Sequence, residues 1–314
     1  MSFAKRGLSF TIRLNAGDEQ QGKVSNYQFD NGATALTLRG LRSRVTAQSC
    51  IGGDTAFVGQ ALIQIWGMKP EDMAQLSTLG FDMGKMGLNT ISISAYGEGQ
   101  ANDVVVFSGG IFSAHINYNA MPDVCLELEC SSTIGLQVQP IPGTSVRGAA
   151  DVAAMLKGIC AACKPPLNFV NNGVSAVLSN HACAGSPAQQ IEDICTAAGV
   201  PYMISDGSLY VWKNGQNRDG VVIQTGSGMG LVGFPEYTMY GLDVTMEFNP
   251  EVQLGRMLSI NNAGSDTSKA ATAIPGVPGA FWINTVTHDL SCELPDGPWY
   301  TQASVSTIQI VGRN

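Results

Sequence analysis

The sequence predicts a mainly β protein with a small α/β unit near its middle. Apolar and polar residues alternate in many short runs over about the first 130 residues, as in half-buried strands. The hydrophobic period becomes helical after residue 147, and alternating runs return from about residue 220. Glycine turns separate the short runs, which favours an antiparallel barrel or sandwich in both β regions.

The first β region contains several expected strands. The alternation is clearest at Leu8, Phe10, Ile12 and Leu14, which would share one buried face. The other expected strands are 35–38, 61–66, 90–95, 103–107, 111–118 and 124–130.

One short helix is expected inside this region. Pro70 fits its first turn, because a helix needs no amide hydrogen there. Its apolar face would be Met73, Leu76 and Leu79, and Gly80 would end it.

Residues from about 148 to 213 are expected to form the α/β unit. The Pro/Gly/Ser-rich segment 137–147 separates them from the first β region. A first helix ends before Pro165-Pro166, and its apolar stripe is Val152, Met155, Leu156, Ile159, Cys160 and Cys163.

The second helix and the hairpin after it have strong local signals. Ser186 is the expected N-cap, Pro187 the first helical residue and Gly199 the C-cap. Asp206-Gly207 lies between two apolar runs, which is the strongest short signal of a β-hairpin.

The last β region has expected strands at 221–225, 242–248, 256–261, 281–290 and 302–311. Segment 262–280 is rich in Gly, Ser, Ala, Thr and Pro and is expected to be an exposed loop. Residues 228–233 match GxGxxG, but Phe234-Pro235 follows where a dinucleotide site would need a helix. We therefore expect a glycine loop between strands.

The composition excludes several protein classes. Only 13% of the 314 residues are charged, and the net charge is −8, which excludes a basic nucleic-acid-binding protein. The apolar content of 44% excludes a disordered chain. A folded chain with so few charges often covers part of its surface by assembling with partners.

The N-terminal segment lacks the apolar core of a signal peptide, and no run of residues is long enough to span a membrane. We therefore expect neither export by the secretory route nor membrane insertion. The chain has eight cysteines, and without an export signal reduced thiols in a reducing cytoplasm are the better expectation.

Four residues have side chains suited to zinc: Cys160, Cys163, His181 and Cys183. Their spacing, C-x2-C-x17-H-x-C, is not a common finger pattern, and both early cysteines lie on the apolar stripe of a helix. Core packing is therefore the favoured interpretation, ahead of zinc and of a redox pair. Whether they bind a metal stays open.

The histidines His115, His181 and His288 are scattered, and a hydrogen-bonded structural role is expected for each. His288-Asp289 could orient a base, but no matching nucleophile motif accompanies it.

Two pairs of carboxylates leave glycoside cleavage open. Glu127 and Glu129 lie two residues apart on a strand and so share a face, and Glu192-Asp193 are adjacent on the second helix. Exposed, solvated charges are the favoured interpretation.

The basic residues are sparse apart from Arg39, Arg42 and Arg44. These three could pair with an acidic partner or a phosphate, although such residues usually form a solvated strand face.

Several stretches together resemble the baseplate hub proteins of bacteriophage tails, of the Mu-type or late-control-D-like kind, related to the hub part of VgrG-type spikes. The similar segments keep their order along nearly the whole chain. They are LRGLR at 38–42, IQIWGM at 63–68, FSGGI at 107–111, MPDV at 121–124, GFPEY at 233–237, FNP at 248–250, VTHDL at 286–290 and DGPW at 296–299.

The resemblance implies two tube-type antiparallel β-barrel domains flanking an α/β domain. The domains would be 1–136, 137–213 and 214–314. It also implies a structural virion protein: a homotrimeric adaptor that joins the hexameric tail tube to the central spike and contacts other baseplate proteins. Genome DNA would pass through the lumen without specific binding.

No catalytic, cofactor-binding or metal-binding residue follows from the resemblance, so a non-enzyme is expected. The expected location is the tail baseplate of the virion, after assembly in the bacterial cytoplasm. Two alternatives remain: a tail-associated cell-wall hydrolase, and the hub portion of a type VI secretion or tailocin spike.

Overall fold

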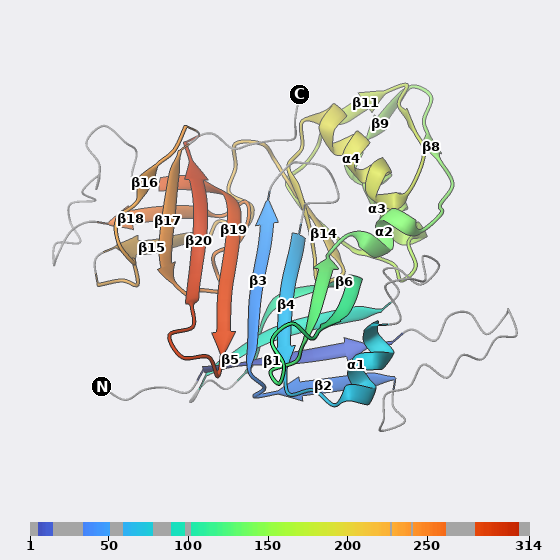
Figure 1. Ribbon diagram of the computed structural model, residues 1–314. Coiled ribbons are helices and arrows are strands. Elements are labelled where there is room, and N and C mark those ends of the chain that lie inside the picture. The colour runs from blue at the N-terminus through green and yellow to red at the C-terminus, as the bar shows by residue number, and fades with distance from the viewer. Residues whose placement is uncertain are drawn as a thin grey trace, which may run out of the picture. The chain divides into compact units, whose positions relative to one another are not determined.

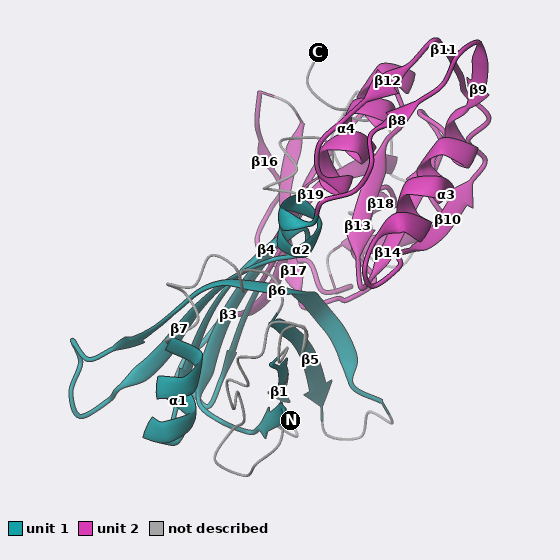
Figure 2. Cartoon of the chain, turned by 90° about the vertical axis from the view of Figure 1, so that its right-hand side faces the viewer, with its two compact units in different colours: residues 1–47, 59–139, 289–298 teal, residues 48–58, 140–288, 299–314 magenta. Residues whose placement is uncertain are grey.

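The computed structural model describes residues 6–14, 34–50, 59–77, 89–97, 102–226, 228–239, 241–261 and 280–307. The chain divides into two compact units (Figure 2). Unit 1 comprises residues 1–47, 59–139 and 289–298, and unit 2 comprises residues 48–58, 140–288 and 299–314. The described residues are mainly β, as predicted.

Unit 1 is built on an antiparallel sheet whose strands lie in the order β3-β4-β7-β6-β5-β1-β2 (Figure 1). Two short helices accompany it, α1 (Pro70–Ser77) and α2 (Ile134–Val138). The strands are β1 (Arg6–Arg13), β2 (Ala35–Arg39), β3 (Ser43–Cys50), β4 (Gly59–Trp66), β5 (Thr90–Gly97), β6 (Val104–Asn117) and β7 (Cys125–Ser131).

The alternation in the first strand is confirmed. Leu8, Phe10 and Ile12 of β1 are fully buried, and β1 lies between β2 and β5. Helix α1 begins at Pro70, as predicted, and packs on β6. Its residues Met73 and Leu76 are buried, whereas the predicted residues Leu79 and Gly80 lie outside the described residues.

One prediction in unit 1 is wrong. Segments 103–107 and 111–118 were expected as two strands, but β6 is one strand with a shift of register against β7 between Ile111 and Ser113. Gly109 lies inside the strand, and a Cβ there would meet the carbonyl oxygen of Ser131 at 2.7 Å. The glycine therefore permits close packing of two strands and does not form a turn.

The α/β part of unit 2 has the two predicted helices, α3 (Val152–Ala162) and α4 (Pro187–Ala198). Ser186 forms a capping box with Gln189, and Gly199 ends α4 in the left-handed conformation at φ 63°. The helices pack on each other beside a three-stranded sheet, β10-β14-β13.

The predicted hairpin is present as β13 (Tyr202–Ser205) and β14 (Ser208–Trp212), with Asp206 and Gly207 both at positive φ. Strand β10 (Asn168–Asn172), which was not predicted, pairs in parallel with β14. Four short strands complete this part: β8 (Thr144–Ser145), β9 (Ala149–Asp151), β11 (Val177–Ser179) and β12 (Ala182–Cys183).

The remaining strands of unit 2 form its second sheet region, in the order β16-β17-β20-β19, with β18 between β19 and β15. One pair departs from the expected antiparallel arrangement, because β15 and β18 run parallel. The strands are β15 (Val222–Gly226), β16 (Glu236–Tyr237), β17 (Leu242–Glu247), β18 (Met257–Asn261), β19 (Ala280–Cys292) and β20 (Trp299–Ser306).

The hairpin and the second sheet region share a hydrophobic core. Met203 and Trp212 of the hairpin belong to one buried cluster with Leu242, Leu258 and Ile283 of the sheet strands. Burying this apolar surface couples the stability of the two parts of unit 2.

The expected closed barrels are not found among the described strands. The last strand also differs from its prediction of 302–311: β20 begins at Trp299 and ends at Ser306. Residues 262–279 of the predicted loop lie outside the described residues.

Candidate functional site

The three neighbouring arginines of unit 1 have carboxylate partners within the chain. None of them therefore offers an unpaired charge to a phosphate. The nitrogen–oxygen distances are 3.1 Å for Arg39–Asp103, 3.1 Å for Arg42–Asp123 and 3.7 Å for Arg44–Asp289.

Two of these arginines also lie over aromatic rings. The guanidinium of Arg39 is 4.1 Å from the ring centre of Tyr96, and that of Arg42 is 4.7 Å from the ring of Trp66. Ion pairing and stacking together hold each side chain flat against the sheet.

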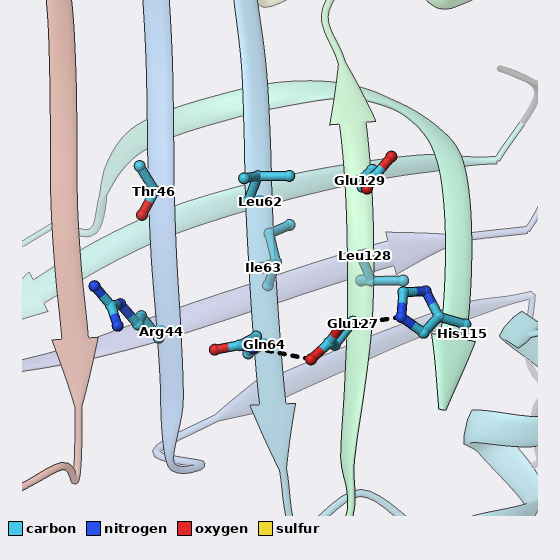
Figure 3. Close-up of a pocket in the computed structure, with 9 residues that line it drawn as sticks. All are labelled: Arg44, Thr46, Leu62, Ile63, Gln64, His115, Glu127, Leu128 and Glu129. Atoms are coloured by element: carbon cyan, nitrogen blue, oxygen red, sulfur yellow. Dashed lines mark hydrogen bonds and ion pairs between the residues drawn. The ribbon is translucent and has the colours of Figure 1, made fainter. Parts of the chain in front are cut away.

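A hollow of about 310 Å³ lies on the sheet of unit 1, and Glu127 is one of the residues that line it (Figure 3). Oε1 of Glu127 accepts hydrogen bonds from Asn117 at 2.8 Å and Gln64 at 2.9 Å. Oε2 lies 2.9 Å from Nε2 of His115. Glu129 is exposed on the same strand.

These contacts keep Glu127 ionised. The hydrogen bond from Asn117 is the largest cause that lowers its pKa, and Gln64 and His115 act in the same direction against partial burial. A general acid for glycoside cleavage needs a raised pKa. The geometry therefore gives Glu127 the role of a structural acceptor.

His288 and Asp289 do not form a dyad. Successive residues of a strand point to opposite faces. His288 is buried, its Nδ1 lies 3.0 Å from Oγ1 of Thr301, and its ring meets Phe248 edge-on. Burial lowers the pKa of His288 to about 4, so the ring is neutral at pH 7.

The four residues considered for zinc do not come together: no group of three or more possible metal ligands occurs among the described residues. Cys160 and Cys163 are buried on α3, and Cys163 Sγ donates to the carbonyl of Ile159. Cys183 Sγ lies 3.8 Å from Oε1 of Gln190.

All eight cysteines are free, and all but Cys50 are buried. Burial raises the pKa of the Cys160 thiol to about 12 and also raises the pKa values of Cys130 and Cys195. These cysteines behave as small apolar core residues.

Unit 2 contains a buried arginine, Arg218, that was not singled out from the sequence. The guanidinium of Arg218, 5% exposed, donates to Gln253 at 2.7 Å and to Asp219 at 3.0 Å. It also lies 5.4 Å from the ring centre of Tyr210 in β14. Arg218 therefore connects the hairpin to the loops of the second sheet region.

The GxGxxG segment is a loop between β15 and β16, as predicted, and no helix follows it. Gly228, Gly230 and Gly233 all have positive φ, and the amide of Glu247 bonds the carbonyl of Gly230 at 2.7 Å. The amide of Val232 also donates to the carbonyl of Thr245, so hydrogen bonds fix the loop to β17.

Large apolar side chains are exposed on this loop and on the edge strand that follows it. We call them the apolar strap: Met229, Val232, Phe234, Tyr237 and Met239. From the sequence this stretch is expected to be a glycine loop, and the exposure of its apolar side chains is not predicted. The available signal is that Met, Leu, Val and Phe fill the positions between its glycines and Pro235, which an ordinary solvated loop avoids.

Beside the strap is a hollow of about 440 Å³ on the face of β17 and β20. Its polar lining includes Glu236, Asp243, Thr245 and Gln302. Among the described residues, no lysine or arginine lines it.

A third hollow is an apolar groove of about 580 Å³ between α3 and the segment that contains β8. We call it the α3 groove. Its lining residues include Ile141, Pro142 and Val146 on one side and Met155 and Gly158 on the other.

Comparison with known proteins identifies the family of the chain. A family model described as baseplate hub gp41 matches residues 81–303. The chain belongs to this family. This baseplate hub protein therefore has a structural role in the tail baseplate of a bacteriophage virion.

Solved structures share the fold of the hub protein. The tail protein from Neisseria meningitidis MC58 matches with a TM-score of 0.58 and 13% identity, over 95% of this chain and 96% of that chain. The 43 kDa tail protein of prophage MuSo2 from Shewanella oneidensis matches with a TM-score of 0.54 and 12% identity, over 96% of each chain. At these identities the likeness concerns the fold alone.

A search of curated protein sequences finds no match to the hub protein. None of the helices in its described part is long and apolar enough to cross a membrane.

Proposed function

We propose that the chain forms a trimeric adaptor in the tail baseplate, which joins the hexameric tail tube to the central spike and lines the DNA channel. The observation that carries this proposal is the hub-family match, because residues 81–303 include parts of both compact units. The role would therefore belong to the chain as a whole.

The proposed domain layout explains how symmetry could be matched. Tube-type β domains at 1–136 and 214–314 would flank the α/β domain at 137–213. Three copies would then present six similar β domains to six tube subunits, while the trimer keeps a threefold side for the spike. The two sheet-rich regions around the helices α3 and α4 support this layout.

The charge distribution supports passage of DNA without binding. The net charge is −8, and Arg39, Arg42 and Arg44 each have an aspartate partner. Binding to nucleic acid needs free cations to neutralise phosphates. A lumen made by this chain would repel DNA weakly and allow it to slide.

A structural role also fits the side chains that could have been catalytic. Glu127 is held ionised, His288 is held neutral by burial, and each has a hydrogen-bond partner inside the fold. We therefore propose no catalytic residue and no cofactor for this chain. We also propose that its assembly begins in the host cytoplasm.

Electron microscopy of assembled tails tests the proposal. With a tag on this chain, the expected image is a threefold ring at the end of the tail tube, in contact with the spike. A tag located on the sheath, the fibres or the tube wall would overturn the hub assignment.

A peptidoglycan-clearing assay separates the hub from the hydrolase alternative. Purified protein is expected to leave cell walls intact from acidic to alkaline pH. Clearing that is lost in Glu127→Gln but retained in Glu192→Gln would instead support a hydrolase centred on Glu127.

A further inference from the structure

Two arginines of unit 2 share one carboxylate. Nη2 of Arg218 lies 3.0 Å and Nε of Arg256 lies 2.8 Å from the same oxygen, Oδ2 of Asp219. The arginine side chains are only 4% and 16% exposed, and that of Asp219 is 26% exposed. Charges in such a place are normally balanced, because an unmatched buried charge is costly. Here two positive charges face one negative charge, and we call these three residues the arginine cluster.

The other partners of the two guanidinium groups are neutral. Arg218 donates to the side-chain oxygen of Gln253 at 2.7 Å and to the sulfur of Met203 at 3.5 Å. Arg256 donates through Nη1 to the backbone carbonyl of Glu251 at 2.7 Å. A thioether sulfur is a weak acceptor, so its use indicates that Arg218 lacks better acceptors. In the described part of the chain, no second carboxylate forms an ion pair with either arginine.

The same region has an unused hydrogen-bond donor in its interior. The indole of Trp212 is fully buried, and its Nε1 has no acceptor among the described residues. A Cβ atom on Gly255 would meet Cε2 of this indole, the atom bonded to Nε1, at 2.8 Å, and Cβ of Arg218 at 3.1 Å. The unmatched groups around the arginine cluster are therefore a cation and a donor, so the region is short of acceptors.

Arg256 is the arginine of the cluster that an outside group can reach. Its Nε and Nη1 make the contacts described above. Nη2 makes no hydrogen bond within the described part of the chain and is not buried, so it is open to solvent. Burial lowers the pKa of Arg218, and the charge of Arg256 acts in the same direction. A negative group bound to Arg256 would reduce this repulsion.

We propose that the arginine cluster binds a carboxylate of a partner protein, an aspartate or glutamate side chain that docks on Arg256. One carboxylate balances the surplus of one positive charge, and its two oxygens match the planar fork of a guanidinium. A phosphate dianion is disfavoured, because it would exceed that surplus beside the exposed residue Glu251. The inference does not depend on a trimer: it assigns the hub protein a site for an acidic segment of a neighbouring baseplate protein.

Acetate, a small probe that carries the same carboxylate, gives the first test. Thermal midpoints of unfolding are compared at neutral pH in sodium acetate and in sodium chloride of equal ionic strength. A ligand that binds only the folded chain stabilises it, so acetate should raise the midpoint of the wild type by about 1–2 °C. Acetamide, which has the same shape without the charge, should not raise the midpoint.

Variants locate the effect of acetate. Arg256→Gln should abolish the shift, whereas Arg256→Lys, which keeps the charge, should retain part of it. Arg44→Gln is the matched control and should retain the full shift, because Arg44 has a carboxylate partner of its own in Asp289. Each shift is measured within one variant, so a less stable fold does not imitate the result. An equal shift in Arg256→Gln and the wild type would overturn the proposal.

A neighbouring glutamate gives a result that a purely structural arginine would not. Glu251→Gln removes the exposed carboxylate of the residue whose carbonyl Arg256 contacts, so acetate should bind more tightly and its shift should increase. If Arg256 served only to hold Asp219 and the loop, the shift would be unchanged. A shift in phosphate that exceeds the acetate shift and is lost in Arg256→Gln would contradict a carboxylate as the ligand.

Assembly into tails tests the partner. Arg256→Glu puts a carboxylate where the partner's carboxylate should dock, so incorporation of the chain into tails should fall about tenfold or more. Lys157→Glu, the same change of charge at an exposed position of α3, is the control and should be incorporated as the wild type is. Normal incorporation of Arg256→Glu as a threefold ring would overturn the site and leave the hub role standing. Absence of that ring in the wild type, with the acetate shift intact, would contradict the proposed function alone.

Discussion

Gly255 lies directly against the indole ring of Trp212: a Cβ atom on residue 255 would meet the ring at 2.6 Å. Gly255 also has a φ of 76°, in the region that favours glycine. Trp212 is fully buried at the end of the hairpin. This contact therefore connects the α/β part of unit 2 to the core of its second sheet region.

Gly255→Ala is expected to lower the free energy of unfolding by roughly 2–4 kcal/mol, because overpacking against Trp212 adds to backbone strain. Gly215→Ala is the control, since Gly215 has the same φ of 76° but an added Cβ would meet nothing within 4 Å. The Gly215→Ala variant should lose only about 1–2 kcal/mol of the free energy of unfolding. Urea denaturation measures the free energy of unfolding of both variants. Equal losses in the two would show that the contact between Gly255 and Trp212 adds nothing to the backbone strain.

Arg218→Met is expected to destabilise the protein by about 2–3 kcal/mol, because it removes the charge-assisted hydrogen bonds that the buried guanidinium donates to Gln253 and Asp219. Arg44→Met is the control, because the side chain of Arg44 is 52% exposed and its ion pair with Asp289 spans 3.7 Å. The control should change stability by about 1 kcal/mol or less. Calorimetric unfolding distinguishes the two, and a small effect at Arg218 would show that the hairpin is held by the core alone.

His288 is expected to make stability depend on pH. Its folded pKa of about 4 lies below the ordinary value, so between pH 6.5 and 4 the unfolded chain binds the extra proton. The contribution of neutral His288 to the free energy of unfolding is complete above pH 6.5. About 3 kcal/mol of that free energy is lost as the pH falls from 6.5 to 4. His288→Gln should lack this loss. An NMR titration that places the imidazole pKa at or above 6.5 would refute the prediction.

Glu127→Gln is expected to cost about 1–2 kcal/mol at pH 7, because it weakens the charge-assisted contacts with Asn117, Gln64 and His115. The folded pKa of Glu127 is lowered, so its contribution is present above the unfolded pKa and disappears as the pH falls through the folded pKa. The difference between wild type and variant should therefore shrink in acid. Glu129→Gln, on the same strand and exposed, should match the wild type throughout.

The features that the sequence predicted well are those fixed by neighbouring residues. The capping box at Ser186, the end of α4 at Gly199 and the Asp206-Gly207 hairpin all depend on contacts within a few residues. Such signals can be seen without knowledge of the tertiary fold.

The missed elements depend on distant partners. Strand β3 is rich in Ser, Thr, Gln and Arg, and β10 has the sequence NFVNN, so neither shows a clear alternation. Each is a strand because a neighbouring strand supplies its hydrogen bonds. The parallel pairing of β15 with β18 likewise joins residues more than thirty positions apart.

The candidate sites show the same limit. The sequence marked Arg39, Arg42 and Arg44 as a basic group, but their aspartate partners lie far away in the chain. Nothing local indicated that Arg218 would be buried. The apolar strap was visible as residue types, but only the structure shows that those side chains are exposed.

The buried thiols have a consequence for the life of the particle. A virion component works outside the cell, in aerated media, where accessible thiolates are oxidised or form mixed disulfides. Seven of the eight cysteines are enclosed in the interior, and burial raises the pKa of the thiols at Cys130, Cys160 and Cys195. These seven thiols are therefore expected to stay unmodified in an oxidising medium, and Cys50 is the position at which oxidation would begin.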